Sequence, residues 1–277
     1  MYMSDTGLNL SPERIAYLKK VKLQKTATWL VRLLILVLIF ALWELAARLK
    51  LIDAFITSQP SRMIKTLTNL YNAGDLFVHI GVTCLETIVG FIIGTLMGIF
   101  IAVLLWWSEF ASRVLEPYLV VLNSLPKVAL GPIFIIWIGA GPSAIIVMAL
   151  AISLIVTILE MLNAFIRTDE EKIKLVETFG ASRFQVFLKV VLPSNIPAMI
   201  NALKVNVGLS WVGVITGEFL VSKAGLGYLI VYGGQVFQLD LVMTSVIILA
   251  IAAALMYQGV VLIEKKLVGN QAAQKHS

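Results

Sequence analysis

The sequence predicts an all-α membrane protein with six transmembrane helices and one helix-turn-helix segment outside the bilayer. Of its 277 residues, 59% are hydrophobic and 14% are charged, and the mean hydropathy is +0.93. Soluble domains carry about 25% charged residues, so this composition indicates an integral membrane protein. Six apolar runs come close to the roughly 20 residues that cross a bilayer, and one polar segment lies between the fourth and fifth runs.

The six spans are expected at about 28–47, 82–107, 118–138, 143–165, 196–220 and 239–263. They define a single transmembrane domain over residues 28–263, with a basic segment (1–27) before it and a tail (264–277) after it. The basic start resembles a signal peptide, but the apolar run that follows is too long and contains Glu44, which indicates a retained first span.

The distribution of lysine and arginine predicts the orientation, because cytoplasmic loops carry the excess of these residues. Six spans put both ends of the chain on the same side. If that side is the cytoplasm, fifteen of the 22 basic residues lie there and five lie outside. The remaining two, Lys127 and Lys204, lie within spans. Both termini and the polar segment are therefore expected in the cytoplasm.

Between the first two spans, an amphipathic stretch carries Met63, Ile64, Leu67 and Tyr71 on one face. Ser61 stands where it could cap the start of this helix. A helix along the outer membrane surface fits the pattern, and contact with an external protein is the alternative.

Glycines in the second span, Gly90, Gly94 and Gly98, recur every four residues. Small residues at this spacing allow another helix to approach closely. The register predicts a helix–helix interface.

The third run contains Pro126, Lys127 and Pro132, which together predict a broken helix. Irregular backbone at membrane depth is tolerated only beside protein or a watery cavity. Ser124 and Lys127 are thus candidates for a translocation path or an anion site. The alternative is that Lys127 extends its ammonium group to the cytoplasmic interface.

The polar segment, residues 168–193, follows the fourth span. A helix is expected over 169–179, a turn at Gly180, and a second helix from Arg183 to Val191 that Pro193 stops. The segment is too polar to span the bilayer and has an apolar face, so a soluble partner is expected to dock against it.

In the fifth run, Asn206, Ser210, Gly213 and Gly217 follow one another at steps of three or four, which makes one small, polar helix face. That face is expected to line the interior. The candidates for the translocation path in this run are Asn206, Ser210, Trp211 and Glu218.

The polar segment resembles the "EAA" cytoplasmic loop of ATP-binding-cassette importer permeases. The likeness rests on Gly180 followed, after nine residues, by Val190-Val191-Leu192-Pro193. Lys174, Leu175 and Val176 stand where that loop has Glu-Ala-Ala, and Glu177 lies one turn further on. The rest of the chain is similar to permeases of the nitrate, sulfonate and taurine type, on the motifs Leu115-Glu116-Pro117, Leu125-Pro126, Gly131-Pro132, Gly217-Glu218 and Gly225-Leu226-Gly227.

This resemblance implies a multi-pass permease of the bacterial inner membrane that works with cytoplasmic ATP-binding subunits, a second permease copy and an extracytoplasmic solute-binding protein. ATP and Mg²⁺ would bind to the partner ATPase and no cofactor to this chain. The solute would be a sulfonate, nitrate, taurine or similar small organic anion, or alternatively a thiamine-precursor pyrimidine. The residues implied in ATPase docking are Lys174, Glu177, Phe179, Gly180, Ala181, Ser182, Arg183, Phe184, Leu192 and Pro193.

Several kinds of chemistry are not expected. The sequence contains no G-x-x-x-x-G-K-[ST] phosphate loop, no H-E-x-x-H motif and no G-x-S-x-G motif. Its two histidines are far apart and Cys84 is its single cysteine, so neither a metal site nor a disulfide is expected. Basic residues are divided among membrane-flanking segments, which argues against nucleic-acid binding.

Two other classes remain open at this stage. An ion-coupled secondary transporter would need no ATPase, and such folds often contain internal repeats, which are not found here. A membrane scaffold or channel would use a docking partner without turnover. Co-purification of an ATP-binding subunit would distinguish an importer from a secondary transporter. ATP-dependent uptake would distinguish an importer from a scaffold or channel.

Overall fold

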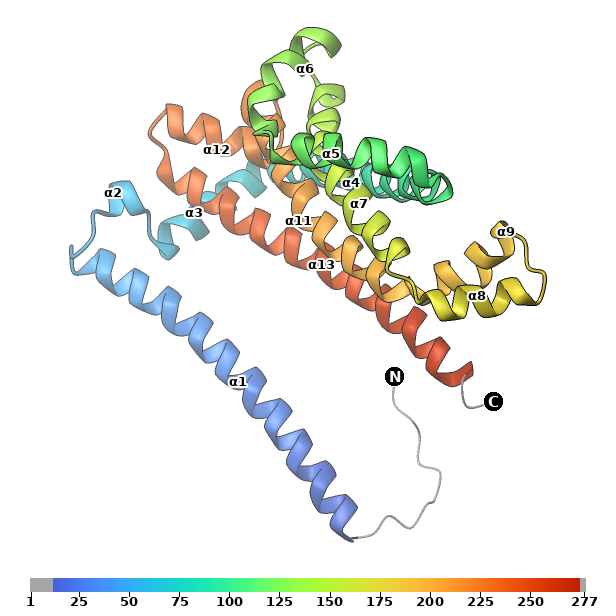
Figure 1. Cartoon of the computed structure of the whole chain (residues 1–277). Coiled ribbons are helices and arrows are strands. Elements are labelled where there is room, and N and C mark those ends of the chain that lie inside the picture. The colour runs from blue at the N-terminus through green and yellow to red at the C-terminus, as the bar shows by residue number, and fades with distance from the viewer. Residues whose placement is uncertain (1–11, 275–277) are drawn as a thin grey trace. The chain divides into compact units, whose positions relative to one another are not determined.

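A computed structural model describes residues 12–274, and this part of the chain is helical with no β-strand (Figure 1). Residues 1–11 of the predicted basic segment and 275–277 of the tail lie outside the described residues. The elements are α1 (Pro12–Arg48), α2 (Ala54–Thr57), α3 (Pro60–Ala73), α4 (Asp75–Trp107), α5 (Glu109–Ser124), η1 (Lys127–Leu130), α6 (Gly131–Ile138), α7 (Pro142–Ile166), α8 (Glu170–Thr178), α9 (Arg183–Val186), η2 (Phe187–Val191), α10 (Leu192–Ser194), α11 (Ile196–Val221), α12 (Leu226–Gln235) and α13 (Leu239–Gln274).

Five helices of the described chain are long and apolar enough to cross a membrane. They are α1, α4, α7, α11 and α13, and α5 with η1 and α6 makes a sixth span if this bent pair is counted as one. The predicted all-α membrane fold is confirmed. α7 and α11 begin and end within one residue of the predicted runs, whereas α1, α4 and α13 extend well beyond them.

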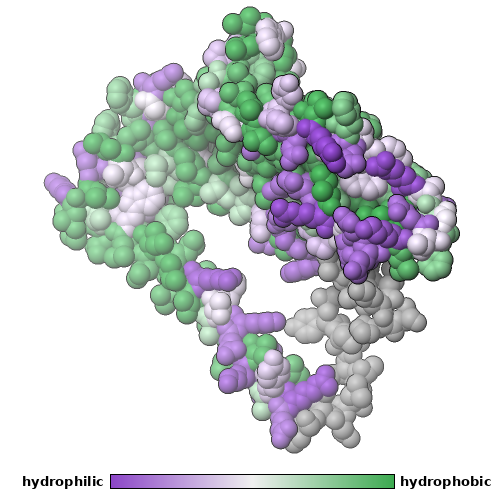
Figure 2. Space-filling view, in the orientation of Figure 1, coloured by the Kyte–Doolittle hydropathy of each residue, from purple (hydrophilic) through white to green (hydrophobic). Residues whose placement is uncertain are grey.

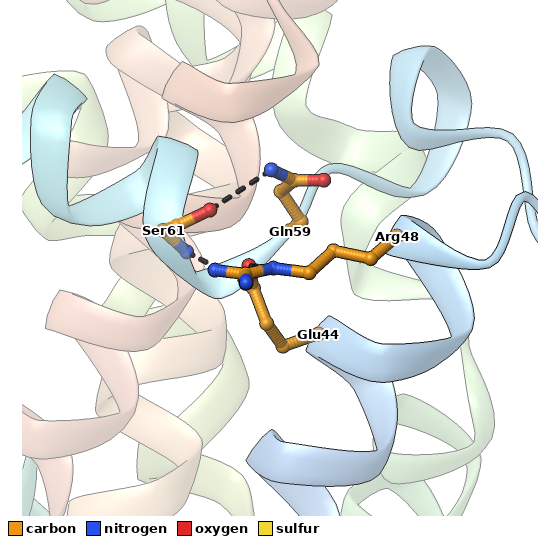
Figure 3. Close-up of polar contacts among 4 residues, drawn as sticks. All are labelled: Glu44, Arg48, Gln59 and Ser61. Carbon is orange, nitrogen blue, oxygen red and sulfur yellow. Dashed lines mark hydrogen bonds and ion pairs between the residues drawn. The ribbon is translucent and has the colours of Figure 1, made fainter.

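The chain divides into two units, residues 1–64 and residues 65–277. In the first unit, the Glu44 carboxylate of α1 lies at the start of α3 (Figure 3). Glu44 Oε2 accepts the backbone N–H of Ser61 at 3.0 Å, and Glu44 Oε1 lies 2.7 Å from Arg48 Nε. The expectation that Ser61 caps α3 is wrong. Pro60 suits the first helical position because it needs no hydrogen-bond acceptor, so Ser61 lies inside the helix and a carboxylate supplies the cap.

In the second unit, α7 lies between α4 and α11 and makes its largest contacts with these two helices. Gly90, Gly94 and Gly98 of α4 face α7, where an added Cβ would lie within 3 Å of Ala149, Ser153 and Thr157 respectively. The interface predicted from the glycine register is confirmed. Its neighbour could not be named from the sequence.

The third predicted span is bent by 87° between α5 and the pair η1 and α6. α5 ends at Ser124, and Leu125 and Pro126 have extended or irregular backbone before η1 begins. The break therefore falls at the predicted proline, whose ring and missing N–H oppose a continuous helix.

Candidate functional site

The polar segment begins with a capped helix. The Asp169 side chain accepts the backbone N–H of Glu171 at 3.0 Å and so caps α8. This hydrogen bond lowers the pKa of the Asp169 carboxyl, because it stabilises the ionised form. α8 ends in a turn at Gly180, whose φ of +81° is a left-handed conformation that glycine adopts without steric cost.

A capping box starts the second helix of the polar segment. The Ser182 hydroxyl accepts the N–H of Gln185, and the Gln185 side chain accepts the N–H of Ser182 in return. The turn between α8 and α9 is therefore fixed by backbone conformation and by side-chain hydrogen bonds. It connects two short helices that protrude at one end of the second unit (Figure 1).

The predicted stop at Pro193 is wrong. α9 continues as the π-helix η2, in which Leu192 N–H bonds to Phe187 O, and then as α10 through Ser194. The wider turn restarts the hydrogen-bond pattern, so Pro193 falls at the beginning of a new turn, where its missing N–H costs nothing. The helical path ends at Asn195.

Asn195 closes the base of the polar segment. Its side chain is buried and donates to Thr168 Oγ1 at 2.7 Å and to Val191 O at 2.8 Å. Thr168 follows the C-cap residue of α7, and Asn195 immediately precedes α11. This hydrogen bond, which the sequence analysis missed, joins the two points where the segment leaves and re-enters the bundle.

Aromatic residues anchor the segment to the end of α4. Phe187 is buried, with its ring centroid 5.1 Å from Trp106 and 5.7 Å from Phe165. The Arg183 guanidinium lies 5.6 Å from the centroid of the Trp106 ring, within the range of a cation–π contact. These contacts hold α9 and η2 against the bundle.

The outward surface of the segment keeps apolar side chains exposed. Phe179 is 82% exposed and Phe184 is 58% exposed. Of the residues predicted to dock a partner, Ala181 and Leu192 are half-buried and the others are exposed, namely Lys174, Glu177, Phe179, Gly180, Ser182, Arg183, Phe184 and Pro193. Figure 2 shows hydrophilic residues gathered over the end of the second unit that carries α8 and α9.

A cavity of ≈ 550 Å³ lies between the polar segment and residues of α4, α5 and α7. Six charged residues from α5, α8 and α9 contribute to its wall: Glu109, Arg113, Glu116, Glu170, Glu177 and Arg183. Two of its carboxylates have a cation nearby: Glu109 pairs with Arg113 at 2.6 Å and Glu170 with Lys174 at 3.0 Å. The segment thus buries Val186 and Phe187 against the bundle, presents charged residues to the cavity, and leaves Phe179 and Phe184 exposed.

Ser124 and Lys127 lie on either side of the break between α5 and η1. Ser124 is exposed, and Lys127 Nζ donates to Asn123 O at 2.9 Å and to Asn123 Oδ1 at 3.1 Å. The ammonium group thus sits over the carbonyl end of α5. It remains partly open to an additional ligand.

The polar face of α11 is buried within the second unit. Asn206 is 1% exposed and its amide donates to Thr95 at 3.0 Å and to Thr157 at 2.5 Å. Ser210 and Trp211 are also buried, and among the described residues no partner meets Ser210 Oγ or Trp211 Nε1. Asn206 therefore links α4, α7 and α11. A role of these residues in the path stays a prediction.

Two charged residues lie toward opposite ends of α11. Lys204 forms an ion pair with Glu264 of α13, with 2.7 Å between Nζ and Oε2. Glu218 is 1% exposed and accepts the N–H of Gly227 at 2.5 Å. Each has a partner within the chain.

Residues 94–267 match the family of binding-protein-dependent transport system inner membrane components. The chain belongs to this family. The match covers α5 to α12, the C-terminal part of α4 and most of α13. The polar segment, the broken span and α11 are therefore parts of an ABC transporter permease that crosses the membrane several times.

Relatives agree with this assignment. The permease is 28% identical over 245 residues to SsuC of Bacillus subtilis, a protein named for aliphatic sulfonate transport, with 88% of each chain covered. It is 31% identical over 225 residues to a Haemophilus influenzae protein named as an ABC transporter permease, covering 81% of this chain and 91% of that one. A chain of the inward-facing MetNI methionine ABC transporter shares the fold, with 20% identity, a TM-score of 0.59, and coverage of 67% and 92%.

Proposed function

We propose that this permease forms the translocation path of an ATP-driven importer for a small organic anion of the sulfonate class. Family membership supports the transporter class, and the relative named for aliphatic sulfonates supports the solute class. The observation that carries the proposal is the exposure of two apolar side chains, Phe179 and Phe184, on the polar segment. Both termini and this segment would face the cytoplasm, and an external binding protein would deliver the solute.

The exposed phenylalanines need a protein partner. Phe179 and Phe184 lie beside charged residues of α8 and α9, which rules out a place in the hydrocarbon core. Solvent-exposed aromatic side chains rimmed by charges are typical of protein interfaces. The partner would be the ATP-binding subunit, because the sequence itself contains no phosphate-binding loop.

The broken span supports a second permease copy. The irregular backbone around Leu125 and Pro126, the exposed Ser124 and the partly exposed Lys127 would sit at membrane depth. Such groups are tolerated only against protein or a water-filled cavity. A second copy facing this bend would enclose the irregular backbone and the two side chains, and Ser124 and Lys127 would then line the path.

Lys127 suits an anionic solute. A primary ammonium group presents three donors, and Asn123 engages it through two oxygens. A sulfonate oxygen could accept a further hydrogen bond from the same nitrogen. The site would favour anions through charge and would discriminate poorly among their apolar parts.

Coupling would pass through the base of the polar segment. When ATP closes the partner dimer, each ATPase would move the α8–α9 turn that it holds. The Asn195–Thr168 hydrogen bond ties the segment to the ends of α7 and α11, so the movement would tilt both helices together. Alternating access would follow from that tilt.

The test for the partner compares two exposed phenylalanines. Phe179 is 82% exposed, and Phe77, near the other end of α4, is 67% exposed. We expect Phe179→Ala to reduce the amount of ATP-binding subunit that co-purifies with the tagged permease, and Phe77→Ala to leave it unchanged. Equal recovery with both variants would contradict docking through this surface.

The test for the solute uses proteoliposomes that contain the complete complex, with the binding protein outside and ATP inside. Uptake of a radiolabelled short alkyl sulfonate should require ATP and should be competed by taurine. Competition by a thiamine-precursor pyrimidine instead would reassign the solute. ATP-independent uptake driven by an ion gradient would reject the importer.

A further inference from the structure

The N-terminus of α12 is held by three side chains from two other helices. Gly225 N–H donates to His79 Nδ1 at 2.9 Å, Leu226 N–H to Thr83 Oγ1 at 2.7 Å, and Gly227 N–H to Glu218 Oε2 at 2.5 Å. These N–H groups have no acceptor within α12 itself, as at the start of any helix. Residues of α4 and α11 therefore complete this helix end.

The glycines on either side of Leu226 make room for the Glu218 carboxylate. A Cβ built at Gly225 or at Gly227 would collide with the Glu218 carboxyl group. Gly225 also has a φ of +117°, which a residue with a side chain rarely adopts. The Gly-Leu-Gly sequence thus fits a carboxyl group packed directly against the helix end.

A second carboxyl group lies beside the first. Glu86 of α4 is 3% exposed and Glu218 is 1% exposed, and their side chains lie within hydrogen-bonding reach of each other. Glu86 Oε2 and Glu218 Oε1 have no hydrogen-bond partner among the described residues. No lysine or arginine among residues 12–274 forms an ion pair with either acid.

A hydrogen bond between these two acids would require a proton. An ionised carboxylate has only acceptor oxygens, so one of the two groups must be protonated to donate. Two negative charges in contact, without a cation and away from water, would repel each other strongly. One remaining negative charge is favourable here, because three backbone N–H groups at the start of α12 point toward this side of the bundle.

We propose that Glu86 and Glu218 share one proton and that this acid pair fastens the N-terminus of α12 to α4 and α11. The other ionisable groups near the pair are His79 and Cys84 on α4 and Tyr228 on α12, which stacks on His79 with 5.9 Å between ring centroids. The pair positions α12 for transport and contacts neither the polar segment nor the bend at Lys127.

Infrared spectroscopy of the full-length permease in lipid tests the shared proton directly. A protonated carboxyl gives a C=O band that is separate from carboxylate and amide bands and shifts in D₂O. We expect Glu86→Gln and Glu218→Gln each to remove the same single band, because a glutamine amide can donate the hydrogen that the proton supplied. Glu160→Gln, at a half-buried acid of α7, should leave that band in place.

Two spectral outcomes would overturn the proposal. If each variant removes a different band, both acids are protonated independently. If neither variant changes the spectrum in this region, both acids are ionised, and a bound cation must then compensate them.

Stability measurements test the positioning role. Glu86→Gln should keep a thermal midpoint and uptake rate close to those of the wild type, whereas Glu86→Ala, which leaves Glu218 without its partner, should lower both. Equal losses in the glutamine and alanine variants would contradict a hydrogen-bonded pair. Because ATPase co-purification should stay normal in every variant, failure here is distinguishable from failure of the docking surface.

Discussion

The polar segment and the α4–α7–α11 core differ in which side chains they bury: the segment exposes apolar side chains, and the core buries polar ones. In the segment, Phe179 and Phe184 are exposed while charged residues surround them. In the core, Asn206 is almost completely buried and hydrogen-bonded to hydroxyl groups of two other helices. Exposed apolar groups beside charges favour contact with another molecule, whereas the amide N–H groups of Asn206 already have acceptors within the chain. The segment is therefore where we expect a protein partner to bind.

The largest effect is expected at Gly180. Proline is locked at a φ near −65°, so Gly180→Pro cannot adopt the observed +81° and should disrupt the α8–α9 turn. We expect loss of uptake and of ATPase co-purification, with membrane insertion intact.

Gly74→Pro is the matched control for this variant. Gly74 has the same φ of +81° and, like Gly180, no atom within 4 Å of an added Cβ. The control should retain the ATP-binding subunit. Normal uptake by the Gly180→Pro variant would show that the turn does not couple the ATPase to the membrane helices.

Variants of Phe187 and Phe184 distinguish packing of the polar segment against the bundle from docking of the ATP-binding subunit. Phe187→Ala empties a buried position between Trp106 and Phe165, and removing a buried phenylalanine costs about 3–5 kcal/mol. Phe184→Ala should change the free energy of unfolding little and weaken only the co-purification. Thermal unfolding in detergent and pull-down of the ATPase measure the two effects, and similar unfolding curves would refute the anchor.

The partly exposed Lys127 at the bend is expected to affect the binding of the solute. Lys127→Gln removes the charge that a sulfonate would meet, and a loss of ~1.4 kcal/mol raises the KM for uptake about tenfold. Lys223→Gln, which removes an exposed charge from the loop before α12, is the control and should leave KM unchanged. An unchanged KM in the Lys127 variant would place the path elsewhere.

The smallest effect is expected in the core. Asn206→Ala removes both hydrogen bonds to Thr95 and Thr157, and interhelical hydrogen bonds of this kind contribute about 1 kcal/mol in membranes. Stability in detergent should fall by that amount while KM stays constant. Asn201→Ala, at an exposed position of α11, serves as control. A changed KM at normal stability would indicate that Asn206 lines the translocation path.

The features that could be predicted from the sequence are those that depend on the composition and periodicity of a single helix. Hydropathy located the spans, Pro126 located the break, and the spacing of Gly90, Gly94 and Gly98 identified a packing face. These features follow from local composition and from the 3.6-residue period of a helix.

What depends on tertiary contacts was missed. The period showed that Asn206 and Ser210 share a face but not that α4 and α7 cover it. The hydrogen bond between Thr168 and Asn195 joins residues 27 positions apart, and no local pattern announces it. α12 was not predicted as a helix because its start is completed by Thr83 and Glu218 from other helices.

α11 also has a mechanical consequence. It is a continuous helix of 26 residues, which at 1.5 Å per residue is about 39 Å long. One end adjoins Asn195 at the base of the polar segment, and the other carries Glu218. For a rigid rod of this length, a tilt of about 10° at one end displaces the far end by about 7 Å, which exceeds the ~4.6 Å diameter of the cylinder on which the Cα atoms of a helix lie. A small rotation imposed at the Asn195 end would thus reach the opposite end of the helix as a displacement large enough to open or close a passage.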